Sequence, residues 1–472
     1  MNAGASRLGF LAVLVLGLGL RLALLPLAES VPPVGDSIDY LKFARQWVET
    51  GEFGTLPLGM RPPIGRVLMG LGLDTSVEPA EAWPGVYLVQ IAADLATLWL
   101  LMVLTRRLFG AGPALVTGVV YATLPQAIHY SALSVHVEPF NALMSTLGLL
   151  ALAWIEARVP ADEGAPRWLV PCLGMGVALG LVIGTGLLVK QAMLMAGLAM
   201  VGAIVLTLRV PWMRRATLVV AIASTAFLVD LPWRLHTEKL LGVALTSGTY
   251  GAFHVVAMNF PPDQQDYDRI WAELPDTQAR LDYSSDVLRR AWTEYRDVTW
   301  SRVPRRLGLT IGPEIMYGTR LVRLLETADE FPWLFGQDPG SRFRDPDARS
   351  PREEMAAIRR MPLTSKAGFA RFLAELLMLL FLSAGAAGLT SAGGSAQRRA
   401  TLLMLLAMLA SGVVIGGVAR YRFLLAPFLA PFAGLAWVQL VQGKLSRRAR
   451  VVGGVVLAIV GTTMFVLPRL AA

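Results

Sequence analysis

Charged residues are scarce in this chain: Asp, Glu, Lys and Arg make up 16% of its 472 residues, whereas 54% are hydrophobic. Soluble domains carry about 25% charged residues, so this composition excludes a typical soluble domain and indicates a membrane protein. The chain has one cysteine, Cys172, which excludes a disulfide within it. Because Cys172 lies in an apolar run, we expect it to act as a small hydrophobic side chain.

Glycine-rich phosphate loops of the P-loop or Rossmann kind are also absent from the sequence, which argues against a nucleotide ligand. The formal net charge of +9 could suggest nucleic acid. Most basic residues, however, lie in short loops between apolar segments, where membrane topology requires them. We therefore expect no nucleic-acid partner.

Long apolar runs make up much of the sequence. About eleven are long enough for spanning helices, near residues 8–27, 84–104, 112–130, 139–156, 168–188, 191–208, 216–233, 369–390, 400–418, 423–441 and 451–468. The arginine-rich loops fall on one side, which predicts a cytoplasmic N-terminus and an outer C-terminus. The first run is longer than the core of a typical signal peptide, so we expect a retained signal anchor. The sequence predicts an all-α polytopic membrane protein.

This topology divides the chain into three parts. Residues 1–233 form an N-terminal transmembrane module with a first outer loop at 28–83. Residues 234–368 form a partly helical extracytoplasmic subdomain, in which "RDVTWSRVPRRLGLTIG" predicts an amphipathic helix on the membrane surface. Residues 369–472 supply the C-terminal transmembrane helices. In the fifth span, glycines every four residues predict close helix packing: Gly176, Gly180 and Gly184.

The first outer loop contains two acidic residues close to the membrane. The segment "DSIDYLKFARQWVETG" predicts an amphipathic helix that ends at Gly51. Asp36 could cap this helix or serve as a catalytic carboxylate, and the residue pattern leaves both open. Asp39 is expected to be a first-turn acid that supports the helix.

A second acid, Glu138, begins the fourth span, where a carboxylate is costly unless it is paired, hydrated or functional. It could also be a simple partner of the helix dipole. His129 and His136 lie close to it in the sequence, and the three could hold a divalent metal ion. Their spacing matches no known ligand motif, so hydrogen-bonded structural histidines are the default and no cofactor is certain.

Several cations on the outer side oppose the positive-inside rule: Arg61, Lys190, Arg234, Arg420 and Arg422. Snorkelling anchors would explain one or two of them. Together they fit an anionic ligand at the level of the lipid headgroups, because arginine can bind phosphate with two parallel hydrogen bonds. A lipid phosphate is then the natural ligand.

The sequence resembles the C-type (GT-C) glycosyltransferases, in the branch of the protein O-mannosyltransferases and the lipid A aminoarabinose transferase. The motifs that carry the resemblance follow in order: "RPP", "HYSALSVHVEPF", "GLVIGTGLLVKQAML", "DLPWRLHTEKLLGVALTSGTYGAF" and "ARYRFLLAPFLAPFAGLA". Such enzymes take a sugar from a polyprenyl phosphate on the extracytoplasmic side and transfer it, with inversion, to a hydroxyl of a lipid, glycan or protein. The resemblance implies a multi-pass protein of the inner (plasma) membrane.

The resemblance also implies roles for individual residues. Asp36 and Glu138 match the acidic positions of the catalytic site. The basic positions that bind the donor phosphate correspond to Lys190, Arg420, Arg422 and Arg61. Residues expected to support them or to bind the acceptor are Asp39, Tyr40, His129, His136 and Tyr421. The chain departs from the family where Ser37 follows Asp36 in place of Glu, and where Gln191 follows Lys190 in place of proline.

Two other classes of protein fit parts of the sequence. A transporter or lipid flippase would carry ionisable residues within its spans, as Asp94, Asp230 and Glu375 are placed. The lopsided outer segments and the lack of an internal repeat argue against it. A scaffold protein would leave the outer acids and cations unexplained.

Overall fold

The structure is a computed structural model, and all its regular elements among the described residues are helical. It describes residues 3–29, 36–53, 61–76, 84–159, 168–246, 252, 255–256, 259, 270–271, 273–311, 365–411 and 423–462. Side chains are not described for residues 3–6, 27–29, 36, 304–311 and 367–368. The predicted all-α class is confirmed, while the three-part division of the chain stays a prediction.

The N-terminal half contains most of the elements discussed below. They are α1 (Ala3–Glu29), α2 (Asp36–Thr50), α3 (Pro63–Gly70), α4 (Pro84–Phe109), α5 (Ala111–Ala122), α6 (Pro125–Ile128), the π-helix η1 (His129–Leu133), α7 (Glu138–Arg158), α8 (Leu169–Val189), α9 (Met193–Thr207) and α10 (Trp212–Leu241). The remaining helices are α13 (Thr277–Thr293), α14 (Arg296–Ile311), α18 (Lys366–Ser391), α19 (Ala396–Ser411), α20 (Ala426–Val441) and α21 (Arg447–Gly461).

Seven helical segments of the described chain are long and apolar enough to cross a membrane. Helix α5 and the α6–η1 segment form an eighth if they are one span, bent by 55° at the break before Pro125. Helices lie at all eleven predicted windows, but α9, α19 and α21 are shorter than 18 residues as described. The structure therefore supports seven or eight spans, and the number eleven is not confirmed.

The predicted outer helices are present. Helix α2 covers the amphipathic segment and ends at Gly51, whose φ of +70° and N–H bond to Trp47 O form the expected glycine termination. The structure describes α2 from Asp36 onward, and residues 30–35 lie outside the described part of the chain, so the capping role of Asp36 stays a prediction. Helix α14 covers the segment predicted to lie on the membrane surface, and that location stays a prediction.

Helix α8 packs closely against α10 along the glycines singled out in the sequence. A Cβ atom at Gly176, Gly180 or Gly184 would lie 2.6–2.8 Å from atoms of α10. Real Cβ atoms do not approach so closely, so the two backbones can meet only because these residues are glycine. The predicted close packing is confirmed.

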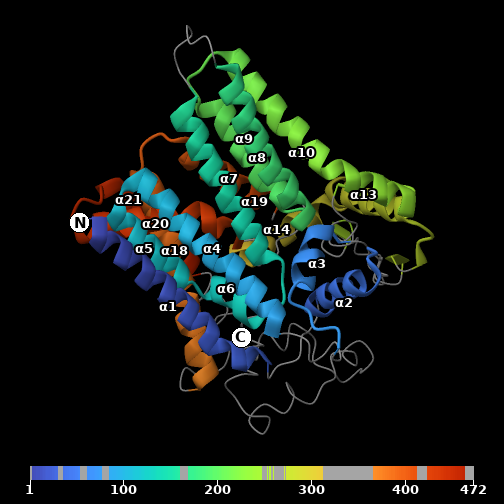
Figure 1. The fold of residues 1–472 in the computed structure, drawn as a ribbon, viewed down its shortest axis with the longest axis horizontal. Coiled ribbons are helices and arrows are strands. Elements are labelled where there is room, and N and C mark those ends of the chain that lie inside the picture. Colours follow the sequence, from blue (N-terminus) through green and yellow to red (C-terminus); the bar gives the residue numbers. More distant parts are fainter. Residues whose placement is uncertain are drawn as a thin grey trace.

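Two hydrophobic clusters organise the part of the fold that matters here. The larger cluster lies between the long helices. A second cluster joins α2, α3 and α4 to the segment before α7 and to the end of α8, through residues that include Tyr40, Met69, Tyr87, Val137 and Val189. Figure 1 shows α2 and α3 side by side, beside the ends of the long helices. The first outer loop is thereby fixed onto the transmembrane bundle.

A buried ion pair ties the first span to its neighbours. Arg21 Nε on α1 donates to Asp94 Oδ2 on α4 at 2.5 Å, and Tyr121 on α5 donates to Asp94 Oδ1 at 2.8 Å. Arg21 Nη1 also donates to the carbonyls of Gly17 and Ala122. All three side chains are fully buried. Each charge is thus satisfied inside the bundle, as an ion in lipid requires.

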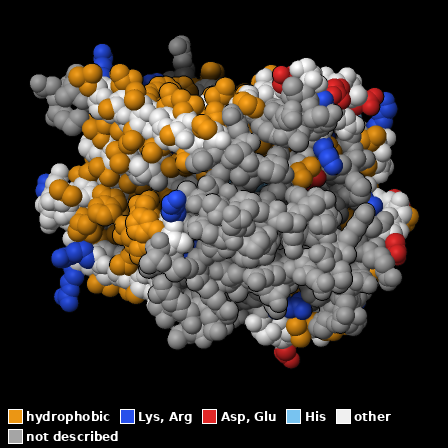
Figure 2. Space-filling view, turned by 90° about the horizontal axis from the view of Figure 1, so that it is seen from below, with side chains coloured by type: hydrophobic (Ala, Val, Ile, Leu, Met, Phe, Trp, Pro, Cys, Tyr) orange, Lys and Arg blue, Asp and Glu red, His pale blue; other side chains and the backbone are white. Residues whose placement is uncertain are grey.

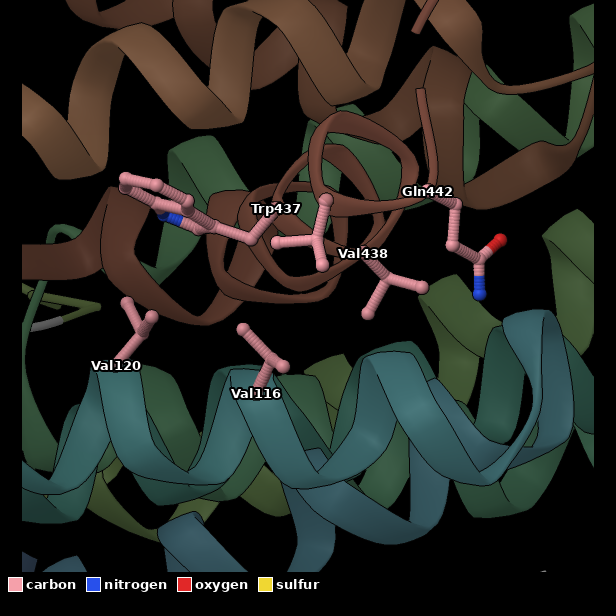
Figure 3. A pocket seen from close by; sticks show the side chains of 6 residues that line it. Val116, Val120, Trp437, Val438 and Gln442 are labelled. Atoms are coloured by element: carbon pink, nitrogen blue, oxygen red, sulfur yellow. The ribbon is translucent and has the colours of Figure 1, made fainter. Parts of the chain in front are cut away.

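The described surface separates apolar from charged side chains. Figure 2 shows hydrophobic side chains gathered on the left of the view and acidic ones on the right, the side of α13 in Figure 1. An apolar groove of about 340 Å³ lies between α5 and α20, lined by Val116, Val120, Trp437, Val438, Val441 and Gln442. Figure 3 shows the side chains that line it. None of the sequence-predicted site residues lines this groove.

Candidate functional site

The structure brings together two of the predicted site residues, Glu138 and Lys190. Glu138 is the first residue of α7, and Lys190 follows the last residue of α8, where the backbone becomes extended. Lys190 Nζ donates to Glu138 Oε1 at 2.5 Å, with side-chain exposures of 13% and 2%. A largely buried ion pair therefore lies where α7 begins and α8 ends.

The segment before α7 is held in place by a side chain of α4. Gln90 on α4 donates from its amide nitrogen to the carbonyls of Tyr130 and Ser134, at 2.6 and 2.8 Å. Its amide oxygen accepts from the backbone N–H of His136 at 3.3 Å. One buried side chain thus satisfies three backbone groups of an irregular segment, which would otherwise be costly in a membrane bundle.

Packed aromatic side chains connect the ion pair to α2 and to Arg61. His136 Nδ1 lies 3.8 Å from Glu138 Oε2, and the His136 ring contacts Tyr40 and Tyr130 edge-on. The Arg61 guanidinium lies over the Tyr40 ring, 4.5 Å from its centroid. Residues predicted to support the reaction therefore form one continuous packed row.

Asp39 and Arg61 form a second ion pair in this region. Arg61 Nη2 donates to Asp39 Oδ2 at 3.3 Å, and Arg61 is 5% exposed. Asp39 is thus held by a cation from the next segment of the loop. Its predicted role as support agrees with this contact.

Helix α3 packs between the two ion pairs. A Cβ atom at Gly65 would lie 2.5 Å from Val137 Cγ1 and 3.6 Å from Val189 O. Those two residues immediately precede Glu138 and Lys190. The segment "RPPIGR" therefore lies directly against both elements that supply the Glu138–Lys190 pair.

Arg66, the last residue of that segment, was not singled out in the sequence. Its guanidinium donates to Arg61 O at 2.5 Å and lies 3.9 Å from the Phe43 ring centroid. Burial, together with the charge of Arg61, lowers the pKa of Arg66 from 12.5 to about 9. Arg66 is therefore a buried cation at neutral pH, and it fixes the backbone that carries Arg61.

Four of the predicted residues cannot be placed in this geometry. Arg420, Tyr421 and Arg422 lie outside the described residues. Asp36 is placed by its backbone alone, one turn before Asp39 at the start of α2. The described chain resumes at Phe423, whose ring lies 5.2 Å from that of Tyr130.

A metal site built from His129, His136 and Glu138 is not formed. Within the described ranges, no group of three His, Cys, Asp or Glu side chains is arranged to hold a metal ion. The Tyr130 ring contacts both histidine rings, at 5.2 and 5.4 Å between centroids, and Glu138 bonds Lys190. Aromatic packing and an ion pair thus involve these three side chains in the described structure, and metal binding here, which the sequence raised only as a possibility, stays a prediction.

The acidic residues that could have marked a transport path are paired with arginine. Besides the Arg21–Asp94 pair, Arg234 donates to Asp230 at 2.6 Å, and Arg371 lies 3.6 Å from Glu375. Each pair except Arg21–Asp94 lies within one helix, at a separation of four residues. Such pairs stabilise helices and need no transported ion to explain them.

A comparison with protein families finds a match. Residues 61–235 match the family model described as dolichyl-phosphate-mannose-protein mannosyltransferase. This range contains Arg61, Glu138 and Lys190. A search of curated proteins finds no match.

Solved structures share the architecture at low sequence identity. The apo oligosaccharyltransferase of Archaeoglobus fulgidus matches with a TM-score of 0.51 and 15% identity, over 99% of this chain and 56% of that one. The same enzyme tethered to an acceptor peptide containing the NVT sequon matches with a TM-score of 0.51 and 14% identity, over 99% and 55%. ArnT of Cupriavidus metallidurans bound to undecaprenyl phosphate matches with a TM-score of 0.40 and 14% identity, over 93% of this chain and 78% of that one.

The chain spans a little over half the length of the oligosaccharyltransferase structure that it matches. At these identities the likeness concerns the fold. Together with the family-model match, it confirms the resemblance to the GT-C superfamily that the sequence motifs indicated.

Proposed function

Because this chain has the fold of the GT-C glycosyltransferases, we propose that it transfers a sugar from a polyprenyl phosphate to a hydroxyl of a lipid, glycan or protein acceptor. The observation that supports the proposal most is the meeting of Glu138 and Lys190 beside the "RPPIGR" segment. Two of the structures similar to this chain are enzymes described with a dolichol-phosphate and with undecaprenyl phosphate. The reaction would take place on the extracytoplasmic side of the plasma membrane.

Lys190 is the cation proposed to bind the donor phosphate, with Arg61 and the predicted residues Arg420 and Arg422. In the ligand-free protein Lys190 bonds Glu138, so its ammonium group is already held at a fixed position. Three N–H donors allow it to keep this bond and also to bind a phosphate oxygen. Glu138 would then act mainly by positioning Lys190.

The proposed reaction needs one base and one stabilised leaving group. An acceptor hydroxyl oxygen would form a bond to the anomeric carbon as the bond from that carbon to the phosphate oxygen breaks. A carboxylate, for which we propose Asp36, would take the hydroxyl proton, and such a base contributes about 10²–10⁴-fold. The polyprenyl phosphate would leave with the bonding electrons, and nearby cations would stabilise its charge. Inversion follows from attack opposite the leaving group.

Binding of a polyprenyl phosphate to the purified protein in nanodiscs tests the phosphate site. Lys190→Gln alone would leave Glu138 buried without its cation, so the informative variant is Lys190→Gln combined with Glu138→Gln, which keeps a neutral hydrogen-bonded pair. We expect the double variant to bind about tenfold more weakly, because a charge-assisted bond to phosphate is lost.

The matched control is Arg289→Gln, whose guanidinium is exposed on α13 and pairs with Asp286. Unchanged affinity in the double variant would exclude Lys190 from the phosphate site. Transfer activity is tested separately with Asp36→Asn: normal turnover in this variant, at normal expression, would show that Asp36 is not the base.

A further inference from the structure

Asn141 is a buried polar residue that neither the motifs nor the ion pairs explain. It lies on α7, three residues after Glu138, and its side chain is 0% exposed. Neither its amide nitrogen nor its amide oxygen has a hydrogen-bond partner among the described residues. Burying an amide without partners is costly, so such a group in a folded protein calls for an explanation.

The other buried polar side chains of α7 each make at least one polar contact within the described residues. Thr146 donates to the carbonyl of Ala142 at 2.8 Å, Ser145 contacts Met193 Sδ at 3.6 Å, and Glu138 accepts from Lys190. Asn141 differs from them although it lies on the same helix, in the same bundle. The lack of a hydrogen-bond partner for the amide is therefore specific to position 141 and is not shared along the helix.

Asn141 faces the turn between α8 and α9. Residues three and four apart on a helix share a face, so Asn141 lies beside Glu138 on one side and Ser145 on the other. Glu138 contacts Lys190 at the start of that turn, and Ser145 contacts Met193 at its end. A Cβ atom at Gly186 would lie close to both Met193 and Met144, which places Met144 against the same elements. Contacts on both sides thus direct this face of α7 to the Lys190–Met193 turn.

We propose that Asn141 hydrogen-bonds a hydroxyl group of the sugar carried by the lipid phosphate donor, and so helps to determine which sugar is accepted. The inference rests on the proposed function, because it takes Lys190 as the phosphate-binding cation. In a sugar phosphate, the hydroxyls nearest to the phosphate lie within a few ångströms of it. A neutral amide that donates and accepts at once is suited to a hydroxyl, which does the same.

The test compares two ligands, polyprenyl phosphate without sugar and a panel of polyprenyl-phosphate hexoses and pentoses. Their affinities for the protein in nanodiscs are measured for the wild type, Asn141→Leu and a control, Thr146→Val, which alters a buried polar residue of α7 that bonds its own helix. The wild type should prefer one sugar-bearing ligand over the bare phosphate. Asn141→Leu should lose about tenfold of that preference while its affinity for the bare phosphate stays unchanged.

Thermal unfolding of the ligand-free protein gives a second readout. If the amide serves a ligand, replacing it with an apolar group of similar size removes an unsatisfied polar group, so Asn141→Leu should raise Tm by about 1–2 °C. A structural role predicts a lower Tm.

The outcomes separate this inference from the proposed function. Loss of bare-phosphate binding in the Lys190→Gln/Glu138→Gln variant, together with an unchanged sugar preference in Asn141→Leu, would overturn the role of Asn141 alone. A wild type that binds no lipid phosphate would overturn the proposed function. A lowered Tm in Asn141→Leu, with the preference intact, would make Asn141 a structural residue.

Discussion

Arg66 shows how a single buried charge can support a site without touching its ligand. Its guanidinium lies on the Phe43 ring and donates to Arg61 O, and these two contacts fix the backbone next to the Asp39–Arg61 pair. A cation over an aromatic face in a desolvated place contributes about 2 kcal/mol, which offsets part of the cost of burial. Arg66 is therefore a residue whose charge can be tested by pH.

We expect Arg66→Lys to make the stability of the protein depend on pH near neutrality. Burial, with the charge of Arg61, lowers the pKa of Arg66 to about 9, and it would lower the pKa of a lysine, ordinarily about 10.4, in the same direction toward neutral pH. Above that pH the folded variant would release the proton while the unfolded chain keeps it. The free energy of unfolding should therefore rise by about 1–2 kcal/mol between pH 6.0 and 8.5.

Thermal or denaturant unfolding of the detergent-solubilised variant, compared with the wild type at both pH values, measures this rise. Arg45→Lys is the control, because Arg45 is partly exposed and pairs with Glu49 on the same helix. An equal pH dependence in the control and in Arg66→Lys would contradict the assignment of the effect to burial.

At the residue scale, sequence reasoning singled out the candidate site residues that break a rule of membrane proteins. Glu138 and Lys190 were noticeable because an acid and an outer cation oppose the usual membrane pattern, and the structure pairs them. Gln90, Arg66 and Asn141 were missed, because a single polar residue in an apolar or helical segment has no local signature. Their importance depends on neighbours such as Tyr130 and Ser134, which follow Gln90 by 40 and 44 positions.

At the scale of the element, the contact between α8 and α10 depends on glycine. Gly180→Ala would place a methyl group 2.7 Å from both Ile222 O and Thr225 Cβ, so the helices must separate. We expect a loss of about 1–3 kcal/mol in the free energy of unfolding. Gly174→Ala, on the same helix with nothing within 4 Å of the added atom, should be neutral or stabilising, because alanine favours helix. Unfolding of the two variants in detergent makes the comparison, and equal stabilities would show that this contact can relax.

The elements themselves could largely be predicted, because hydropathy over about 20 residues is a strong local signal. Helices lie at all the predicted windows, and the small-xxx-small spacing predicted close packing of α8, which the structure shows against α10. The number of spans could not be obtained in this way. Helices α9, α19 and α21 are shorter than a membrane-spanning helix as described, and the bend at Pro125 divides another segment.

At the scale of the whole molecule, the Arg21–Asp94–Tyr121 group joins α1 to the consecutive helices α4 and α5, although Arg21 and Asp94 are 73 positions apart in the sequence. We expect Asp94→Asn or Arg21→Met alone to destabilise the protein by about 3–5 kcal/mol, since each leaves an opposite charge buried. The double variant should lose less than the sum of the two, because no uncompensated charge remains. Unfolding free energies of the four proteins form a double-mutant cycle, and additive losses would show that the two charges do not interact.

The same ion pair has a consequence for the order in which the protein is made. Arg21 leaves the ribosome long before Asp94, so α1 meets the membrane while its charge has no partner. An arginine within an isolated span has an insertion cost that reaches about 2.5–3.5 kcal/mol at the helix centre and is smaller nearer the end, where Arg21 lies, and this cost lasts until α4 is made. During biogenesis there should therefore be an interval in which the first span is only weakly stable in the membrane. The insertion of α4 ends that interval.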